Sequence, residues 1–300
     1  MKVLIIGSEG FIGSNCITFF LRAGADVTGV DLISTPKVFG YRYIPHTTLS
    51  GYASIFKEHK YDFCINASGN GSVPVSINEP LFDFAANCSE PVALLEAIRL
   101  YNPDCRLVHI SSAAVYGTPS QLPVTEDSAL NPLSPYGWHK LISEQLCKEY
   151  VQLYRMPIAV VRPFSVYGPG LRKQLLWDIF QKSKQTKQIQ LFGNGKESRD
   201  FIFISDLVRA ISVIFQQAPM QGEVYNLASG IETHISEIAK TFCSLLHSEI
   251  QVEFNGVVRA GDPLNWVAGI ERVRALGFAP ETSLAAGLQK TVSWMKQLSE

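Results

Sequence analysis

The stretch VLIIGSEGFIG (residues 3–13) places four apolar residues directly before a series of glycines, Gly7, Gly10 and Gly13. An apolar run of this length is typical of a buried strand. The residues that follow suit a helix from about Phe11 to Ala23. The stretch therefore predicts a strand, a tight glycine turn and a helix, which is the opening unit of a parallel α/β sheet.

The same alternation of apolar strands and longer helical segments continues to about residue 165. Further strands are predicted at DVTGVD (26–31), YRYI (41–44), DFCINAS (62–68), RLVHISS (106–112) and IAVVRP (158–163), with long helices at about 80–101 and 135–155. Near-continuous apolar strands between helices predict a parallel sheet that is covered on both faces. We therefore expect a Rossmann-type doubly wound domain over residues 1–165.

The alternation becomes irregular after Gly168. Helices are predicted at about 171–187, 205–216, 234–247 and 283–298, separated by the short runs IQLFG, RDFIFI and VYNLAS. This pattern predicts a smaller C-terminal lobe over residues 166–300. We expect its segments near 200–229 to pack back on the first domain.

Composition excludes several classes of protein. The chain has 300 residues, 46% of them hydrophobic and 18% charged, with a formal net charge of −1. This balance gives no reason to expect a nucleic-acid partner, and no apolar run is long enough to cross a membrane. The 6 cysteines show no metal-ligand spacing, so we expect no metal and a reducing, cytoplasmic location.

The glycine turn has the features of a phosphate-binding loop, although its GxxGxxG spacing departs from the usual GxGxxG. Gly7 allows the tight turn, Gly10 allows close approach of a pyrophosphate, and Gly13 lets the helix pack against the sheet. The helix N-terminus supplies N–H donors and partial positive charge. Asp31, at the end of the second strand, is placed to bind a ribose and to repel a 2′-phosphate. The loop therefore predicts a dinucleotide, with NAD favoured over NADP.

A second constellation lies in SPYGWHK (residues 134–140), where Tyr136 and Lys140 are spaced to share one face of a helix. Alone, the pair could equally be a surface aromatic beside a surface lysine. The strand at 106–112 ends in two serines, at the sheet edge where ligands of open α/β sheets bind.

With GSEGFIG (7–13), SSAAVYG (111–117) and YGWHK (136–140) in this order, the chain resembles the extended short-chain dehydrogenase/reductase family. The resemblance extends through RPFSVYGPG, SRDFIFISDL, VYNLASG and RAGDP. This family contains nucleotide-sugar epimerases, dehydratases and reductases. The resemblance implies that Tyr136 is the acid/base, that Lys140 keeps the phenol acidic, and that Ser112 orients the substrate oxygen.

The resemblance also implies binding residues and partners. Cofactor contacts are expected at Gly7, Gly10, Phe11, Ile12, Gly13, Asp31, Ala67, Asn87, Tyr136 and Lys140. A nucleotide-diphosphate sugar is expected to contact Ser112 and Ser165, together with Arg199 and Arg259 of a substrate-binding C-terminal lobe. The family further implies a homodimer through the long helices near 80–101 and 136–155. Asn66 and Ser165 depart from the residues that the family often has, and His139 is expected to lie off the catalytic face.

Tyr136 can act as a base near pH 7 only if nearby positive charge lowers the pKa of its phenol. A free tyrosine has a pKa of about 10, so action near pH 7 requires a shift of about three units. Two unit charges at about 4 Å and an effective dielectric near 20 interact by about 4 kcal/mol, which is enough. Lys140 and an oxidised nicotinamide together could supply this interaction energy.

The two residues after Ser112 restrict which reactions of the family are possible for this chain. Dehydratases of the family carry an acidic pair there, whereas this chain has Ala113 and Ala114, which cannot transfer protons. We therefore expect chemistry at carbon 4 of the sugar, with a 4-epimerase favoured and a 4-ketoreductase as the alternative. A regulatory dinucleotide sensor and a dehydrogenase of an apolar alcohol are the rival hypotheses. The presence of Ser112, Tyr136 and Lys140 together argues against a sensor. Arg199 and Arg259 argue against an apolar substrate, because an apolar pocket would not tolerate two uncompensated cations.

Overall fold

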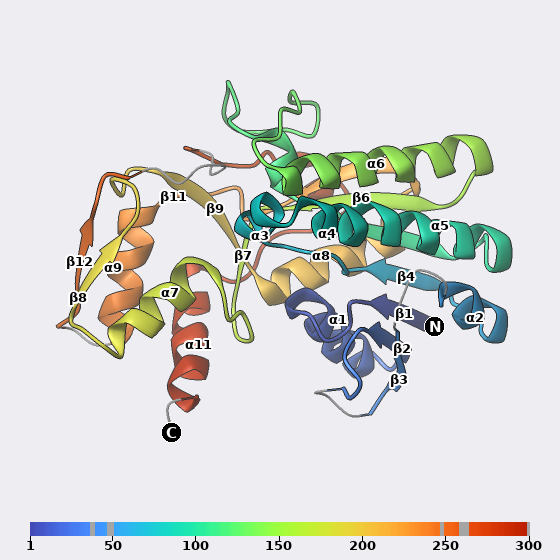
Figure 1. The fold of residues 1–300 in the computed structure, drawn as a ribbon, viewed down its shortest axis with the longest axis horizontal. Coiled ribbons are helices and arrows are strands. Elements are labelled where there is room, and N and C mark those ends of the chain that lie inside the picture. Colours follow the sequence, from blue (N-terminus) through green and yellow to red (C-terminus); the bar gives the residue numbers. More distant parts are fainter. Residues whose placement is uncertain (37–39, 47–50, 247–248, 258–263, 299–300) are drawn as a thin grey trace.

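A computed structural model of the chain describes residues 1–36, 40–46, 51–246, 249–257 and 264–298. Within these residues the main sheet has seven parallel strands in the order β10-β6-β5-β4-β1-β2-β3 (Figure 1). The strands are β1 (Lys2–Ile6), β2 (Asp26–Asp31), β3 (Arg42–Pro45), β4 (Phe63–Asn66), β5 (Arg106–Ile110), β6 (Ile158–Pro163) and β10 (Gln221–Leu227). The predicted doubly wound parallel sheet is confirmed.

Helices cover both faces of this sheet because its strands are apolar on both sides. Val3 and Ile5 of β1 belong to one core, and the intervening Leu4 and Ile6 belong to the other. The first core includes residues of α1 (Phe11–Arg22) and α8 (Ile204–Gln217). The second includes residues of α2 (Tyr52–Glu58), α5 (Glu90–Tyr101) and α6 (Pro135–Tyr154). Figure 1 shows α5 and α6 on one side of the sheet and α1 on the other.

The long helix predicted at 80–101 contains an irregular turn. It begins as α4 (Pro80–Phe84), passes through a π-helical turn at Ala85–Ser89, and continues as α5. A shorter helix, α3 (Val73–Asn78), precedes it. A π turn inserts one extra residue per turn, changes which side chains face inward, and often occurs at functional sites. Here it places Asn87 and Cys88 in the interior.

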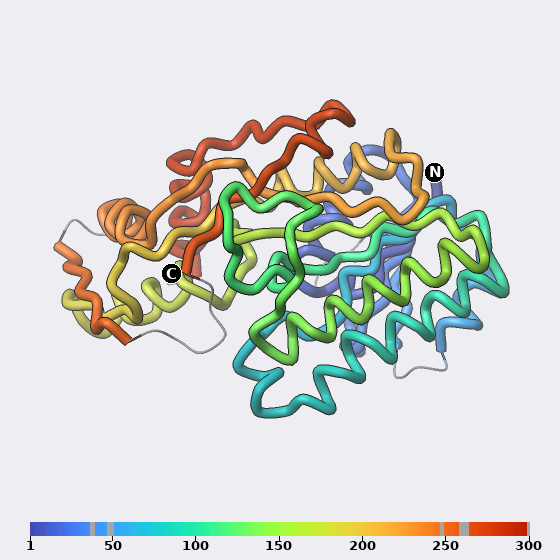
Figure 2. Tube along the Cα trace, turned by 90° about the horizontal axis from the view of Figure 1, so that it is seen from above, coloured from blue at the N-terminus to red at the C-terminus, as the bar shows by residue number. Residues whose placement is uncertain are grey.

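The second lobe lies at one end of the main sheet, as Figures 1 and 2 show. It contains the small sheets β11-β9-β7 and β12-β8. Its strands are β7 (Ser165–Tyr167), β8 (Gln188–Leu191), β9 (Ser198–Phe203), β11 (Glu232–His234) and β12 (Gln251–Phe254). Its helices are α7 (Gln174–Ser183), α9 (Ile235–Leu246) and α11 (Leu284–Gln297), whereas α10 (Glu271–Ala275) packs against β10 of the main sheet. In the described part of the chain, no helix has the length and apolarity needed to cross a bilayer.

Sequence patterns predicted the longer elements of this region better than the shorter ones. The helix predicted at 171–187 is shorter than expected, because Gln174 has a φ of 66° and a left-handed residue cannot continue a helix toward the N-terminus. Strands β7 and β11 have three residues each, too few to show an alternating pattern.

A buried polar network fastens the elements that carry the candidate site. On α6, Glu144 accepts hydrogen bonds of 2.9 and 2.6 Å from Arg162 of β6. The same carboxylate accepts a bond of 2.5 Å from the hydroxyl of Ser111, just after β5. Arg162 also donates to the Tyr116 hydroxyl at 2.8 Å, and this hydroxyl donates to Asn226 of β10 at 2.7 Å. The network thereby fixes α6 against the ends of three neighbouring strands.

Removing the carboxylate of this network should cost far more stability than removing a surface one. We expect Glu144→Ala to lower the free energy of unfolding by about 3–5 kcal/mol, because Arg162 is left buried and uncompensated. The control is Asp178→Ala, which breaks a 2.7 Å pair with Lys182 whose side chains are 33% and 40% exposed. That loss should be at most about 1 kcal/mol. Urea denaturation measures both, and equal losses would contradict the structural role of the network.

Candidate active site

The predicted phosphate loop is a cradle with no room for side chains. Gly7 has a φ of 78°, and a Cβ there would lie 2.7 Å from the carbonyl oxygen of Ala67. A Cβ on Gly13 would lie 2.0 Å from the carbonyl oxygen of Gly7. Gly10 is the N-cap of α1, so the N–H groups of the first turn, at Phe11 and Ile12, have no partner within the helix. The loop therefore brings free backbone donors together at a helix N-terminus.

Asp31 is fastened beside this loop at the carboxyl end of β2. Its carboxylate accepts a hydrogen bond of 2.8 Å from the backbone N–H of Glu9 and one of 2.7 Å from that of Leu32. The Glu9 carboxylate accepts a hydrogen bond from the Tyr41 hydroxyl. Asp31 thus has a fixed orientation next to the phosphate loop.

Ala67 directly follows β4, and Asn87 of the π turn lies against the loop that comes after this strand. The Asn87 amide donates to the carbonyl oxygen of Asn70 at 3.2 Å and to the carboxylate of Asp83 at 3.0 Å. Its other atom, Oδ1, is buried and has no protein partner among the described residues. This oxygen lies 2.4 Å from where a Cβ of Gly69 would stand. An unpartnered buried acceptor is costly unless a ligand donates to it.

The three predicted catalytic residues converge beyond the end of β5. Ser112 caps the 3-10 turn Ala113–Tyr116, and its hydroxyl accepts from the N–H of Ala114 at 3.2 Å. Tyr136 stands in the first turn of α6, with its hydroxyl within hydrogen-bonding reach of Ser112. One turn later, Lys140 is only 5% exposed and donates to the carbonyl oxygen of Ile110 at 3.0 Å.

Burial has opposite effects on the pKa values of the two ionisable partners. It lowers the pKa of Lys140 to about 8, with the negative charge of Asp83 opposing the effect. It raises the pKa of Tyr136, although the Ser112 hydroxyl acts in the lowering direction. The polypeptide alone therefore favours a neutral phenol. The predicted activation near pH 7 needs the further positive charge of an oxidised nicotinamide.

The expected substrate residues come from neighbouring strands of the second lobe. Ser165 begins β7 and pairs with Phe201 of β9, the strand that also carries Arg199. The Arg199 guanidinium donates to the backbone carbonyl oxygen of Leu264 at 3.1 Å. The structure therefore places Ser165 and Arg199 in one small sheet. The fourth expected residue, Arg259, lies outside the described residues.

The lobe also reaches across to the loop after β4. Lys173, directly before α7, donates through Nζ to the carbonyl oxygen of Gly71 at 3.3 Å.

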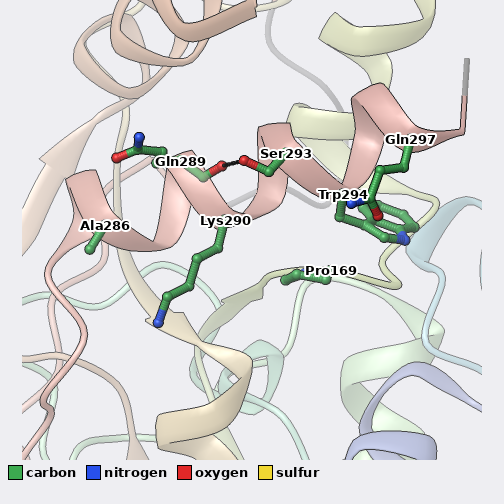
Figure 3. A pocket seen from close by; sticks show the side chains of 7 residues that line it. All are labelled: Pro169, Ala286, Gln289, Lys290, Ser293, Trp294 and Gln297. Carbon is green, nitrogen blue, oxygen red and sulfur yellow. Dashed lines mark hydrogen bonds between the residues drawn. The ribbon is translucent and has the colours of Figure 1, made fainter. Parts of the chain in front are cut away.

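A separate surface groove runs along α11 (Figure 3). It is lined by Pro169, Ala286, Gln289, Lys290, Ser293, Trp294 and Gln297, and includes none of the predicted site residues.

Two polar residues beside the site were not selected from the sequence as functional. Asp83 lies in the apolar segment LFDFAANC (81–88), where a lone acidic residue was the available signal. Asn87 is in the same segment, but the other two hydrogen-bond donors to Asp83, Asn70 and His139, lie elsewhere in the chain and could not be assigned from the sequence. Ser111 was passed over in favour of Ser112, and the structure shows it bonded to Glu144 instead.

The profile of the NAD dependent epimerase/dehydratase family matches residues 3–228. The chain belongs to this family. The match contains the phosphate loop and the residues that converge beyond β5. It therefore agrees with the extended short-chain dehydrogenase/reductase resemblance.

Members of the NAD dependent epimerase/dehydratase family resemble the chain along its whole length. The UDP-glucose 4-epimerase of Mycolicibacterium smegmatis is 29% identical over 100% of both chains. The UDP-glucuronate 4-epimerase of Thermodesulfobacterium geofontis is 29% identical over 98% of this chain and 96% of its own. The crystal structure of UDP-glucuronic acid 4-epimerase from Bacillus cereus, in complex with UDP-glucuronic acid and NAD, has a TM-score of 0.88 at 27% identity. That match covers 99% of this chain and 100% of the other.

The cofactor of the NAD dependent epimerase/dehydratase family is NAD, and the local geometry fits it. The close backbone packing at Gly7 and Gly13 shapes the turn before α1, and the N–H groups of the first turn of that helix are suited to bind a pyrophosphate. The unpartnered Oδ1 of Asn87 offers an acceptor near the catalytic pair. Asp31 offers carboxylate oxygens at the end of β2.

A methyl group at Gly13 should disable the cradle. We expect Gly13→Ala to reduce NAD retention at least about tenfold and to lower the free energy of unfolding by about 1–3 kcal/mol, because backbone atoms must move apart. The matched control is Ser14→Ala, whose hydroxyl bonds back to Phe11 at 3.3 Å within the same helix. Released NAD, assayed after denaturation, provides the measurement. Equal retention in the two variants would rule out the cradle as a cofactor site.

Proposed function

We propose that this chain is an NAD-dependent nucleotide-sugar 4-epimerase. The observation that carries the proposal is the convergence of Ser112, Tyr136 and buried Lys140 at the carboxyl edge of the parallel sheet. The glycine cradle ends at the same edge, two strands away. Similarity to two 4-epimerases along the full chain supports the assignment to this reaction.

The mechanism assigns proton transfer to Tyr136. When NAD is bound, it supplies a hydride acceptor at carbon 4 and, in its oxidised form, a positive charge. Tyr136 accepts the proton of the 4-hydroxyl, while the Ser112 hydroxyl holds the same oxygen in place. The positive charge of Lys140 favours the phenolate. After the keto sugar has turned its other face, Tyr136 would return the proton to the carbonyl oxygen as the hydride goes back to carbon 4 from that face, so the configuration at carbon 4 inverts.

The substrate that we propose is a UDP-sugar, since the similar epimerases act on UDP-glucose or UDP-glucuronate. Arg199 and Arg259 are proposed to bind its diphosphate, because a guanidinium can bond two phosphate oxygens at once. Ser165 is proposed to contact the same region from β7. Arg199 and Arg259 belong to the proposed substrate-binding lobe, residues 166–300, and Ser165 directly precedes it.

Other reactions of the family are less compatible with the residues after Ser112. Ala113 and Ala114 are buried or half-buried in a 3-10 turn, with only methyl side chains to offer. They cannot expel a hydroxyl as water, so 4,6-dehydration is disfavoured. A 4-ketoreductase uses the same Tyr136 and differs in releasing its cofactor after each turnover. Retention of the cofactor therefore separates the two activities.

We also propose a homodimer through α4, α5 and α6. Large apolar side chains are exposed on this side of the molecule: Leu81, Phe82 and Phe84 on α4, and Trp138 and Ile142 on α6. Contiguous exposed apolar groups of this kind mark association surfaces.

A cytoplasmic location is proposed from the 6 cysteines, which are all buried and free.

The central experiment combines Tyr136→Phe with a cofactor assay. Wild-type protein should interconvert UDP-glucose and UDP-galactose, or the corresponding UDP-uronates, without added NAD and should release stoichiometric NAD on denaturation. We expect Tyr136→Phe to retain NAD while kcat falls about 10²–10⁴-fold, because proton transfer is lost. NMR of the sugar anomeric protons measures conversion. Undiminished turnover by the variant would disprove the mechanism. Protein that lacks NAD and consumes NADH with a 4-keto sugar nucleotide would establish the ketoreductase.

The dimer surface can be tested separately. Phe82→Asp places a charge on a side chain that is 55% exposed, and we expect it to give a monomer. The control, Ile231→Asp, alters a side chain of the second lobe that is 65% exposed, and should leave the mass unchanged. Light scattering after gel filtration measures the mass. A dimeric Phe82→Asp variant, or a monomeric wild type, would contradict the proposal.

A further inference from the structure

Asp83 is a completely buried carboxylate at the junction of three segments. It is 0% exposed. It accepts hydrogen bonds from Asn70 at 2.6 Å, from Asn87 at 3.0 Å and from Nδ1 of His139 at 2.5 Å. These donors come from the loop after β4, the π turn and α6. A group with this many fixed donors has one defined position.

The cluster adjoins the catalytic pair. His139 precedes Lys140 on α6, and its backbone carbonyl accepts from the Cys88 thiol at 3.4 Å. The negative charge of Asp83 raises the pKa of Lys140, opposing the larger lowering by burial. It also raises the pKa of Tyr136, in addition to the larger effect of burial. Both members of the pair therefore experience the same charge.

Other ionisable groups that face the pair contribute less charge. Glu144 of α6 forms a 2.6 Å ion pair with Arg162 of β6, which largely neutralises it. On β5, burial and then the charge of Lys140 lower the pKa of His109 to about 3, so its imidazole is neutral near pH 7. Burial raises the pKa of the Cys88 thiol to about 11 and that of the Cys147 thiol further. Among these described groups, Asp83 is left as the main source of negative charge beside the catalytic pair.

We propose that Asp83 is a positioning residue for the catalytic pair. Its carboxylate holds the Asn87 amide so that Oδ1 stays free for the cofactor, and it supplies the negative charge that keeps Lys140 cationic in a buried site. His139 fixes the orientation of that carboxylate. The inference rests on the proposed function, since it gives Tyr136 and Lys140 their roles.

The proposal predicts a translation of the pH profile. On the acidic side, activity rises as the phenol of Tyr136 loses its proton, and on the alkaline side it falls as Lys140 loses its charge. Removing a nearby negative charge lowers both pKa values. We therefore expect both limbs to move to lower pH by about one unit. A residue that served only packing would lower kcat without moving both limbs together.

Asp83→Asn is the variant that removes the charge and keeps the shape. Its amide oxygen can accept from Asn70 and Asn87, and its NH₂ can donate to His139 in the other tautomer. Asp83→Ser removes the charge as well, and serves if the asparagine variant does not fold. Asp83→Glu keeps the charge and should restore both limbs.

Asp206→Asn is the matched control. This carboxylate of α8 is also buried, accepting from Arg209 at 3.0 Å and from the N–H of Thr282 at 2.9 Å. Among the described residues, its hydrogen bonds come from Arg209, Glu281 and Thr282, which are not predicted site residues. Its replacement should reduce stability and leave the pH limits in place.

The ionisation of Tyr136 gives a readout that needs no substrate. Protein labelled with ¹³Cζ-tyrosine is titrated by NMR with its cofactor bound, and Tyr136 is assigned from the Tyr136→Phe spectrum. We expect its midpoint to fall by about one unit in Asp83→Asn or Asp83→Ser, and to stay near wild type in Asp83→Glu and Asp206→Asn. An unmoved midpoint in the neutral variants, or an equal shift in Asp206→Asn, would overturn the proposal. Inactivity toward UDP-sugars would count against the proposed function alone, because the titration does not depend on it.

Discussion

The buried ammonium group of Lys140 is the constraint around which the candidate active site is arranged. A cation removed from water is costly unless hydrogen bonds and opposite charge compensate it. Here the carbonyl oxygen of Ile110 accepts one of its protons, and Asp83 supplies negative charge nearby. Asp83 is held in turn by groups from α6, the π turn and the loop after β4. One positive charge thus links elements that are far apart in the sequence.

Parallel strand topology explains why these elements meet. Strands β1, β2, β4 and β5 run in the same direction, so their carboxyl ends lie at one edge of the sheet. Gly7, Asp31, Ala67 and Ser112 each follow or end one of these strands. We propose that a dinucleotide lies along that edge, where it would be in reach of all four. The second lobe adds Ser165 and Arg199 from a small sheet beside this edge.

The protein and its cofactor have opposite effects on the pKa of Tyr136. The protein makes Lys140 easier to deprotonate and Tyr136 harder to deprotonate, both because of burial. Neither shift alone favours proton abstraction from a sugar hydroxyl. The positive charge of an oxidised nicotinamide acts in the favourable direction on the phenol. In the proposed mechanism, Tyr136 would become a strong base chiefly when the cofactor is bound and oxidised, and proton transfer would thereby be tied to hydride transfer.

The sequence by itself determined the strands of the main sheet, the approximate extents of the longer helices, the glycine turn and the helical spacing of Tyr136 and Lys140. These are local features, since apolar periodicity, glycine spacing and helical spacing act between residues that are near in the chain. Tertiary structure alone decided the burial of Lys140, the bonds from Asn70 and His139 to Asp83, the unpartnered oxygen of Asn87 and the anchoring of Glu144 by Arg162. Each of these depends on residues that come from separate elements, and their energies depend on exclusion of water. No local pattern in the chain records which polar groups the folded core will bring together.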